Sequence, residues 1–339
     1  MNRTNTNIIF GEVETMKRER RPRVLVSRKI PEAGLELLRQ HCSVTVGAED
    51  GMLKREELLE LIQDQDAFLS MLTDRVDGEL MDVAPELKVV SNYAVGYDNI
   101  DVEEAARRGI AVTNTPGVLT EATADLAWAL LMDAARRVTE GDRLNRAGQW
   151  HEWAPMFHLG KEVTGSTLGI IGFGRIGRAV AKRAAGFNMK VVVHSRTPLD
   201  PEEEKKWGVT FLSLTELLQQ SDFVSIHAPY TEETHHLIGA KELAQMKSSA
   251  YLINTARGAL VDEPALVEAL QTGTIAGAGL DVYEDEPRLA PGLKELDNVV
   301  LAPHLGSATW ETRRAMALRA AKNIVAELVG IGESTRVLG

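Results

Sequence analysis

Three side chains of this 339-residue chain could together do chemistry on a small polar molecule: Arg257, Glu286 and His304. A guanidinium can hold a carboxylate through two parallel hydrogen bonds, and an imidazole can exchange a proton near neutral pH. Taken singly, the three have structural explanations as a capping arginine, a solvated turn and a loop histidine. Each nevertheless follows a predicted strand, and open α/β sheets bind ligands beyond the carboxyl ends of their strands. We therefore expect the three to meet in one crevice.

A glycine-rich segment, Gly172-Phe-Gly-Arg-Ile-Gly177, has the spacing G-x-G-x-x-G. The spacing alone is a weak signal, but this copy follows the apolar run Thr167–Ile171 and opens a predicted helix. In that context Gly172 permits the tight turn, Gly174 lets the backbone approach a pyrophosphate, and Gly177 lets helix and strand pack closely. The helix N-terminus offers free amides to the phosphates. A dinucleotide beside a guanidinium, a carboxylate and an imidazole suggests hydride transfer to a carbonyl.

The end of the next predicted strand indicates which dinucleotide is used. NAD-binding units place an acidic residue there, which accepts hydrogen bonds from the ribose hydroxyls. This chain has Ser195, Arg196 and Thr197 instead, and no acid before Asp200. Arg196 could pair with a 2′-phosphate, and the two hydroxyls could donate hydrogen bonds; the alternative is an exposed loop arginine. We expect NADPH to be preferred, with NADH possible.

Short apolar runs alternate with helical patterns, which is typical of βαβ units and parallel sheets. The first series predicts strands at Arg23–Ser27, Ser43–Val46, Ala67–Met71, Lys88–Asn92 and Ile110–Thr113. The second series predicts six strands, at Thr167–Ile171, Lys190–His194, Phe223–His227, Ala250–Asn254, Ala276–Asp281 and Asn298–Ala302. The expected fold is therefore α/β, with two doubly wound parallel-sheet domains: a Rossmann cofactor domain and a flavodoxin-like substrate domain, with a cleft between them.

Two long helical stretches bear on the domain boundaries. One runs from Thr120 to about Ala147, and an amphipathic one runs from Thr309 to Leu328. We expect the second to cross back and pack on the first domain. The predicted substrate domain is then 23–115 with 308–332, and the dinucleotide-binding domain is 116–307, with hinges near Pro116 and Gly306. Residues 1–22 form a polar extension that we expect to be disordered, and Met16 could be the natural start.

Composition and charge exclude several classes of function. Acidic residues outnumber basic ones, 49 to 38, giving a net charge of -11, which argues against nucleic acid or an anionic membrane as partner. The single cysteine, Cys42, cannot form an intramolecular disulfide and, without a secretory segment, predicts the cytoplasm. No run reaches the ~18 apolar residues of a membrane span. No metal site is expected, because the adjacent His235 and His236 do not fit the usual ligand spacing.

From about Arg23 to Leu328 the chain resembles the D-isomer-specific 2-hydroxyacid dehydrogenases, and within them the glyoxylate/hydroxypyruvate reductase branch. The matching segments are Asn92–Asp101, Gly172–Gly177, Ser195–Thr197, Asn254–Gly258, Val261–Glu263, Gly279–Pro287 and Pro303–Ala308. Together, Asn254–Gly258 and Gly279–Pro287 are specific to the family, although they do not determine the substrate.

The resemblance implies a role for each candidate residue. Arg257 would grip the substrate carboxylate, His304 would protonate the carbonyl oxygen as general acid, and Glu286 would orient His304 and favour its protonated form. Backbone amides around Val95 and Gly96 would also meet the substrate carboxylate. The residues expected around the cofactor are Gly172, Phe173, Gly174, Arg175, Ile176, Gly177, Ser195, Arg196, Thr197, Pro229, Thr255, Ala256, Arg257, Asp281, His304 and Gly306.

The implied activity is reduction of a small 2-oxo acid, glyoxylate first and hydroxypyruvate second. A 3-phosphoglycerate dehydrogenase and a broad 2-ketoaldonate reductase stay open, and a dinucleotide-sensing corepressor on the same fold is the alternative that is not an enzyme. His227, also at a strand end, is the rival for the acid role. The resemblance further implies a homodimer formed through the Thr120–Ala147 region, with Trp150 and Trp153 of the following loop at the interface.

Overall fold

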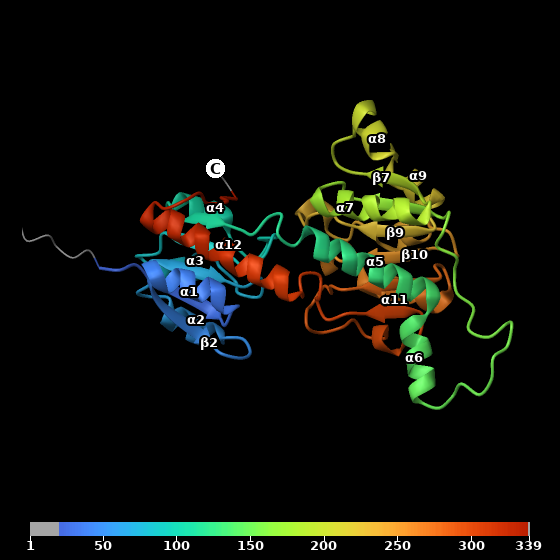
Figure 1. Ribbon diagram of the computed structural model, residues 1–339, viewed down its shortest axis with the longest axis horizontal. Helices are drawn as coiled ribbons and strands as arrows, with labels where there is room; N and C mark the ends of the chain where they lie inside the picture. The colour runs from blue at the N-terminus through green and yellow to red at the C-terminus, as the bar shows by residue number, and fades with distance from the viewer. Residues whose placement is uncertain (1–19, 338–339) are drawn as a thin grey trace, which may run out of the picture.

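Two parallel sheets with helices on both faces make up the part of the chain that the structure describes (Figure 1). This computed structural model describes residues 20–337, so most of the predicted N-terminal extension, with Met16, lies outside the described residues. The two sheets lie side by side along the longest axis, and the chain passes between them before α5 and again before α12. The expected α/β architecture with two parallel-sheet domains is confirmed.

The first sheet has five parallel strands in the order β2-β1-β3-β4-β5. Its strands are β1 (Arg23–Arg28), β2 (Ser43–Ala48), β3 (Ala67–Ser70), β4 (Val89–Asn92) and β5 (Ala111–Thr113). Its helices are α1 (Glu32–His41), α2 (Arg55–Leu61), α3 (Gly78–Asp82), α4 (Val102–Arg107) and α12 (Trp310–Val329). Alternate β1 residues enter different cores, Val24 and Val26 on one face and Leu25 on the other, as a sheet covered on both faces requires.

The last helix, α12, covers one face of this first sheet although it follows the strands of the second. Ala317 packs so closely against Gly34 of α1 that a Cβ at Gly34 would lie 2.9 Å from it. From β4, the Ser91 hydroxyl donates a hydrogen bond to the Ala320 carbonyl over 3.1 Å. Beyond the helix, Arg336 pairs antiparallel with Thr113 of β5. The C-terminal segment is thus built into the first sheet.

The second sheet has seven parallel strands in the order β12-β11-β10-β9-β6-β7-β8. Its strands are β6 (Thr167–Ile171), β7 (Lys190–His194), β8 (Val209–Phe211), β9 (Phe223–Ile226), β10 (Tyr251–Asn254), β11 (Gly277–Leu280) and β12 (Val299–Leu301). Its helices are α5 (Thr120–Arg136), α6 (Val138–Arg146), α7 (Arg175–Ala184), α8 (Pro201–Trp207), α9 (Leu214–Gln220), α10 (Ala240–Leu243) and α11 (Glu263–Thr272). Of the described residues, no helix is both long and apolar enough to cross a membrane.

Two expectations about these elements are wrong. The predicted helix from Thr120 to Ala147 is two helices, because Arg137 adopts a left-handed conformation with φ of 55° between α5 and α6. Asp133 of α5 accepts a hydrogen bond from the Thr139 amide over 2.7 Å and so stabilises the start of α6. The second sheet also has a seventh strand, β8, which is a three-residue edge strand beside β7. A run of three residues is too short to show an alternating pattern.

Candidate active site

The three candidate catalytic residues follow three neighbouring strands of the second sheet. Arg257 comes after β10, Glu286 after β11 and His304 after β12, and these strands are adjacent and parallel. Because the carboxyl ends of parallel strands meet at one edge, the loops that carry the side chains converge there. The three predicted residues therefore lie at one edge of the sheet, as the sequence pattern indicates.

His304 and Glu286 are hydrogen-bonded to each other. The distance from Nδ1 of His304 to Oε2 of Glu286 is 2.8 Å, and both side chains remain about one-quarter exposed. Burial raises the pKa of Glu286, but the hydrogen bond and the charge of His304, together with the charge of Arg257, outweigh it and leave this pKa below its ordinary value. Glu286 is therefore ionised at neutral pH and faces Nδ1, so that Nε2 of His304 is left for a substrate.

Asp281 holds the backbone on which His304 sits. Its buried carboxylate accepts hydrogen bonds from the amides of Leu305 and Gly306, over 2.6 and 2.8 Å, and its carbonyl accepts one from the His304 amide over 2.9 Å. Burial raises the pKa of Asp281 above its ordinary value. His304 has a left-handed backbone with φ of 54°, which costs a non-glycine residue about 1–2 kcal/mol. The bonds to Asp281 stabilise that conformation, so Asp281 is a positioning residue.

Arg257 reaches across to the first domain. Its Nε donates to Oδ1 of Asp98 over 3.0 Å, and its Nη1 donates to the Ala256 carbonyl over 2.8 Å. Its Nη2 faces Gly96, where an added Cβ would lie only 1.7 Å away, so any side chain at that position would displace the guanidinium. Sequence analysis missed Asp98, although it lies within the segment Asn92–Asp101 that carries the family resemblance, because only the packing of the two domains gives it a partner.

The predicted substrate loop is held by its carbonyl groups. The Val95 carbonyl accepts a hydrogen bond from Nδ2 of Asn114, and the Gly96 carbonyl accepts one from Nδ2 of Asn92, both over 2.8 Å. Within residues 20–337, no group accepts a hydrogen bond from the amides of Val95 or Gly96. Two free amides beside the free Nη2 of Arg257 form an arrangement that suits a carboxylate.

The glycine loop has the shape that a dinucleotide requires. Phe173 and Gly174 connect β6 to α7, whose first residues are Arg175 and Ile176. A Cβ on Gly177 would lie 2.1 Å from the Gly172 carbonyl oxygen, so helix and loop approach as closely as only glycine allows. A Cβ on Gly174 would meet no described atom within 4 Å, so this stretch of backbone is open to a ligand. The amides at the start of α7 are available to phosphate.

The other expected cofactor residues follow strands at this same edge. Ser195, Arg196 and Thr197 follow β7, Pro229 follows β9, and Thr255 and Ala256 follow β10. The Thr255 hydroxyl is buried and has no hydrogen-bond partner among the described residues. A buried polar atom without a partner is costly unless a ligand satisfies it. The residues present therefore fit a dinucleotide cofactor.

His227, the rival for the acid role, occupies a different environment. It lies behind the glycine loop, where its Nε2 is 2.8 Å from Oγ of Ser225. Burial lowers the pKa of His227 to about 3, so the ring is neutral at physiological pH. Unlike His304, it has no carboxylate partner among the described residues. This geometry favours His304 as the proton donor.

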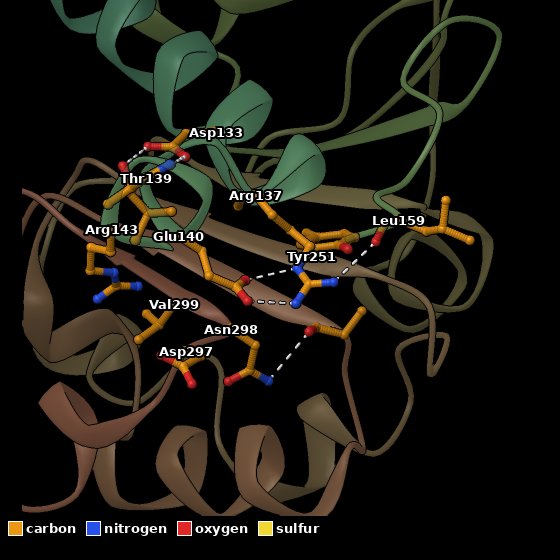
Figure 2. Close-up of a pocket in the computed structure, with 13 residues that line it drawn as sticks. Asp133, Arg137, Thr139, Glu140, Arg143, Leu159, Tyr251, Asp297, Asn298 and Val299 are labelled. Atoms are coloured by element: carbon orange, nitrogen blue, oxygen red, sulfur yellow. Dashed lines mark hydrogen bonds and ion pairs between the residues drawn. The ribbon is translucent and has the colours of Figure 1, made fainter. Parts of the chain in front are cut away.

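A polar pocket of about 220 Å³ opens at the opposite edge of the same sheet (Figure 2). It lies where β10 and β12 begin, at Tyr251 and Val299, and is closed by the junction between α5 and α6. Arg137 crosses it and donates from Nε and Nη2 to both carboxylate oxygens of Glu140, over 2.8 and 2.6 Å (Figure 2). No predicted site residue lines it.

A parallel sheet with a glycine loop, two α/β domains and an Arg–Glu–His group at the carboxyl edge of that sheet are the features of a nicotinamide-dependent dehydrogenase. The chain belongs to the D-isomer-specific 2-hydroxyacid dehydrogenase family, because the model of that family's NAD-binding domain matches residues 128–306. A glyoxylate reductase of Thermococcus onnurineus is 53% identical over 310 residues, which cover 90% of this chain and 92% of that protein.

Solved structures agree with this assignment. A protein of Thermus thermophilus superposes with a TM-score of 0.87 at 48% identity, covering 93% of this chain and 100% of that one. An NADPH-dependent glyoxylate/hydroxypyruvate reductase of Sinorhizobium meliloti, solved with NADP and malonate, superposes with a TM-score of 0.81 at 36% identity, covering 94% of this chain and 97% of that one.

Proposed function

We propose that this protein reduces a small 2-oxo acid to the 2-hydroxy acid with a nicotinamide cofactor, with glyoxylate as the first substrate and hydroxypyruvate as the second. The observation that carries the proposal is the 2.8 Å pair of His304 and Glu286 at the edge where Arg257 faces Gly96. Relatives about half identical to this chain are glyoxylate reductases. The substrate is small and anionic, which fits one guanidinium and two free amides.

Each residue has one task in this proposal. Arg257 and the amides of Val95 and Gly96 hold the substrate carboxylate, while Asp98 and Ala256 fix the orientation of the guanidinium. A bound nicotinamide supplies the hydride. His304 donates the proton from Nε2 to the carbonyl oxygen, because Nδ1 is engaged by Glu286. Glu286 stabilises the charged imidazole before the proton leaves.

A substrate panel at fixed NADPH tests the function. We expect steady oxidation of NADPH with glyoxylate and slower oxidation with hydroxypyruvate. Faster turnover of 3-phosphohydroxypyruvate or of a 2-ketoaldonate would assign one of those activities instead. Dinucleotide binding without turnover of any 2-oxo acid would overturn the proposal in favour of a binding protein.

NADPH is the preferred cofactor in this proposal. Arg196 is exposed after β7, and Asp200, the first acid beyond it, is engaged as the N-cap of α8, accepting from the Glu203 amide over 2.7 Å. A hydrogen bond from Thr231 and, to a smaller degree, the charge of Arg196 lower the pKa of Glu233. The negative charge of Glu233 would therefore oppose binding of a 2′-phosphate at Arg196. The Sinorhizobium relative is NADPH-dependent.

Replacing Arg196 tests this preference. A charge-assisted hydrogen bond is worth ~1.5–3 kcal/mol, so Arg196→Ala should lower kcat/KM for NADPH about tenfold to a hundredfold. The kcat/KM for NADH should stay unchanged, because NADH lacks the 2′-phosphate. A wild type that prefers NADH, or an equal loss with both cofactors, would show that Arg196 is not the selector.

The five-stranded sheet with α12 is proposed as the substrate domain, 23–115 with 308–332, and residues 116–307 as the cofactor domain. Cofactor binding should close the cleft about hinges near Pro116 and Gly306 and exclude water from the reaction. A smaller radius of gyration in solution on adding NADPH would support this; an unchanged radius would contradict it. A cytoplasmic location stays a prediction of the sequence.

A homodimer is proposed from the surface beyond α6. Trp150, Trp153 and Met156 are 54%, 79% and 78% exposed, which is unusual for apolar side chains so close together in one loop. Clustered exposed aromatic and Met side chains are enriched at protein interfaces. Sedimentation should give twice the monomer mass. A single species of monomer mass at micromolar concentration would contradict the proposal.

A further inference from the structure

The segments that follow β9 and β11 bring together a group of side chains that the proposed reaction does not use. His235 and His236 come from the first segment, and Glu284 comes from the second. Each offers one potential ligand atom, and the three atoms lie within 4.8 Å of one another. Within residues 20–337, this is the one trio of His, Cys, Asp or Glu side chains that converges in this way.

The contacts between these side chains are close. Nε2 of His236 lies 2.8 Å from Oε1 of Glu284, and the ring of His235 stacks on that of His236 with 3.9 Å between centroids. The His236 and Glu284 side chains are about one-third exposed, so water and ions reach them. Two imidazole nitrogens and a carboxylate oxygen form a donor set that suits Zn²⁺ and its borderline neighbours, not Mg²⁺ or Ca²⁺.

A second carboxylate stands behind His236. Oδ2 of Asp262 is 4.0 Å from Nδ1 of His236, on the side of the ring away from Glu284. Histidines that ligate metals commonly have a carboxylate on their other ring nitrogen, which orients the ring and raises its basicity. The other oxygen of Asp262 is engaged as the N-cap of α11, accepting from the Ala265 amide over 3.0 Å, so this carboxylate is fixed in place.

The backbone under the trio is also fixed. The His236 amide donates to the Ala259 carbonyl over 2.8 Å, and His236 holds a left-handed φ of 50°. The Glu284 amide donates to the buried Glu263 carboxylate over 2.7 Å. Zn²⁺ needs bonds of about 2.0–2.2 Å, and the three ligand atoms, within 4.8 Å of one another, are close enough for one ion to lie between them.

We propose that His235, His236 and Glu284 form a binding site for a borderline divalent transition ion such as Zn²⁺, with water completing the coordination. The expectation of no metal site considered the histidine pair alone, and the third ligand lies 48 residues further along the chain. A bound ion would join the segment after β9 to the segment that carries Glu286. The site is therefore separate from the catalytic pair but attached to the same loop.

Calorimetric titration of the EDTA-stripped full-length protein with ZnCl₂ tests the proposal. One ion should bind per chain, and MgCl₂ should give no signal. His236→Ala and Glu284→Gln should each weaken binding more than about tenfold, since changes in outer-shell partners alone cost about 10–100-fold. Asp262→Asn, which can still cap α11, should weaken Zn²⁺ binding about 10–100-fold. His151→Ala, a histidine of the exposed loop, is the matched control and should bind as the wild type does.

Two results would overturn the proposal. The first is absence of Zn²⁺ binding by the wild type at micromolar concentration. The second is binding that survives in His236→Ala and is lost in His304→Gln, because the ion would then occupy the catalytic pair. Circular dichroism of each variant checks the fold, and His235→Ala provides an independent ligand deletion.

Discussion

The two edges of the seven-stranded sheet each carry an arginine among polar groups, yet the two arginines differ in whether all of their nitrogens have hydrogen-bond partners. At the amino edge, Arg137 donates from Nε and Nη2 to Glu140 and from Nη1 to the Leu159 carbonyl, so all three nitrogens have acceptors (Figure 2). At the carboxyl edge, Arg257 uses Nε and Nη1 but directs Nη2 at Gly96, and no group within residues 20–337 accepts from that nitrogen.

The nitrogens of the two arginines therefore distinguish the two edges, because only Arg257 keeps one nitrogen without an acceptor among the described residues. The carboxyl edge collects the free Nη2 of Arg257, the free amides of Val95 and Gly96 and the buried hydroxyl of Thr255. Such groups are costly to leave unpaired, and beside the pair of His304 and Glu286 they indicate where a ligand would bind. At the amino edge, Arg137 and Glu140 are paired with each other through two hydrogen bonds, as in a structural ion pair.

The largest expected effect is at the carboxyl edge, at His304. His304→Ala removes the proposed proton donor, so kcat/KM for glyoxylate should fall about 10²–10⁴-fold, as is typical for a lost general acid. NADPH binding, measured by fluorescence titration, should persist. Near-normal turnover by this variant would show that the proton comes from elsewhere and would remove the main reason for assigning catalysis to this edge.

Gly96→Ala tests whether the free Nη2 of Arg257 matters. The new Cβ would lie 1.7 Å from the present position of Nη2, so the guanidinium must move. A misplacement of about 1 Å can cost about 10²-fold in rate, and we expect a loss of kcat/KM of that order. Gly186→Ala is the matched control and should have no effect on turnover, because a Cβ at Gly186 would meet open space at an ordinary φ. Gly109→Ala would be unsuitable, because Gly109 has a positive φ. Equal activity of the Gly96 and Gly186 variants would contradict the predicted carboxylate site.

Glu286→Gln should change the pH profile more than the maximal rate. The lowered pKa of Glu286 keeps it ionised at neutral pH, where its negative charge faces Nδ1 of His304. Gln keeps the size and a hydrogen bond but removes that charge. The reductive activity should therefore fall off at a lower pH than in the wild type. Profiles of kcat/KM against pH that coincide for the two proteins would show that the pairing has no electrostatic role.

The carboxyl edge was predictable from the sequence and the amino edge was not. Arg257, Glu286 and His304 follow strands of one parallel sheet, whose carboxyl ends lie at the same edge, so their convergence could be inferred. The break at Arg137 has no Gly, Pro or Asn to announce a left-handed residue, and one helix was expected there. Asp98 has no local signal either, because it meets Arg257 only when two domains pack. By contrast, α8 carries clear helix signals in the sequence, with Asp200-Pro201 at its start and Gly208 at its end.

The smallest kinetic effect is expected at the amino edge, from Arg137→Ala. This change removes two hydrogen bonds to Glu140, and hydrogen bonds to charged groups contribute about 1.5–3 kcal/mol each at most. Because the Arg137 side chain is 38% exposed, solvent screening reduces the contribution of these hydrogen bonds. We therefore expect a loss of about 1–2 kcal/mol in the free energy of unfolding, measured with urea. The kcat/KM for glyoxylate should stay at the wild-type value when both proteins are compared at the same oligomeric state. A kinetic loss as large as that of Gly96→Ala would mean that the two edges are coupled through the sheet, and satisfaction of polar groups would then not separate a structural arginine from a functional one.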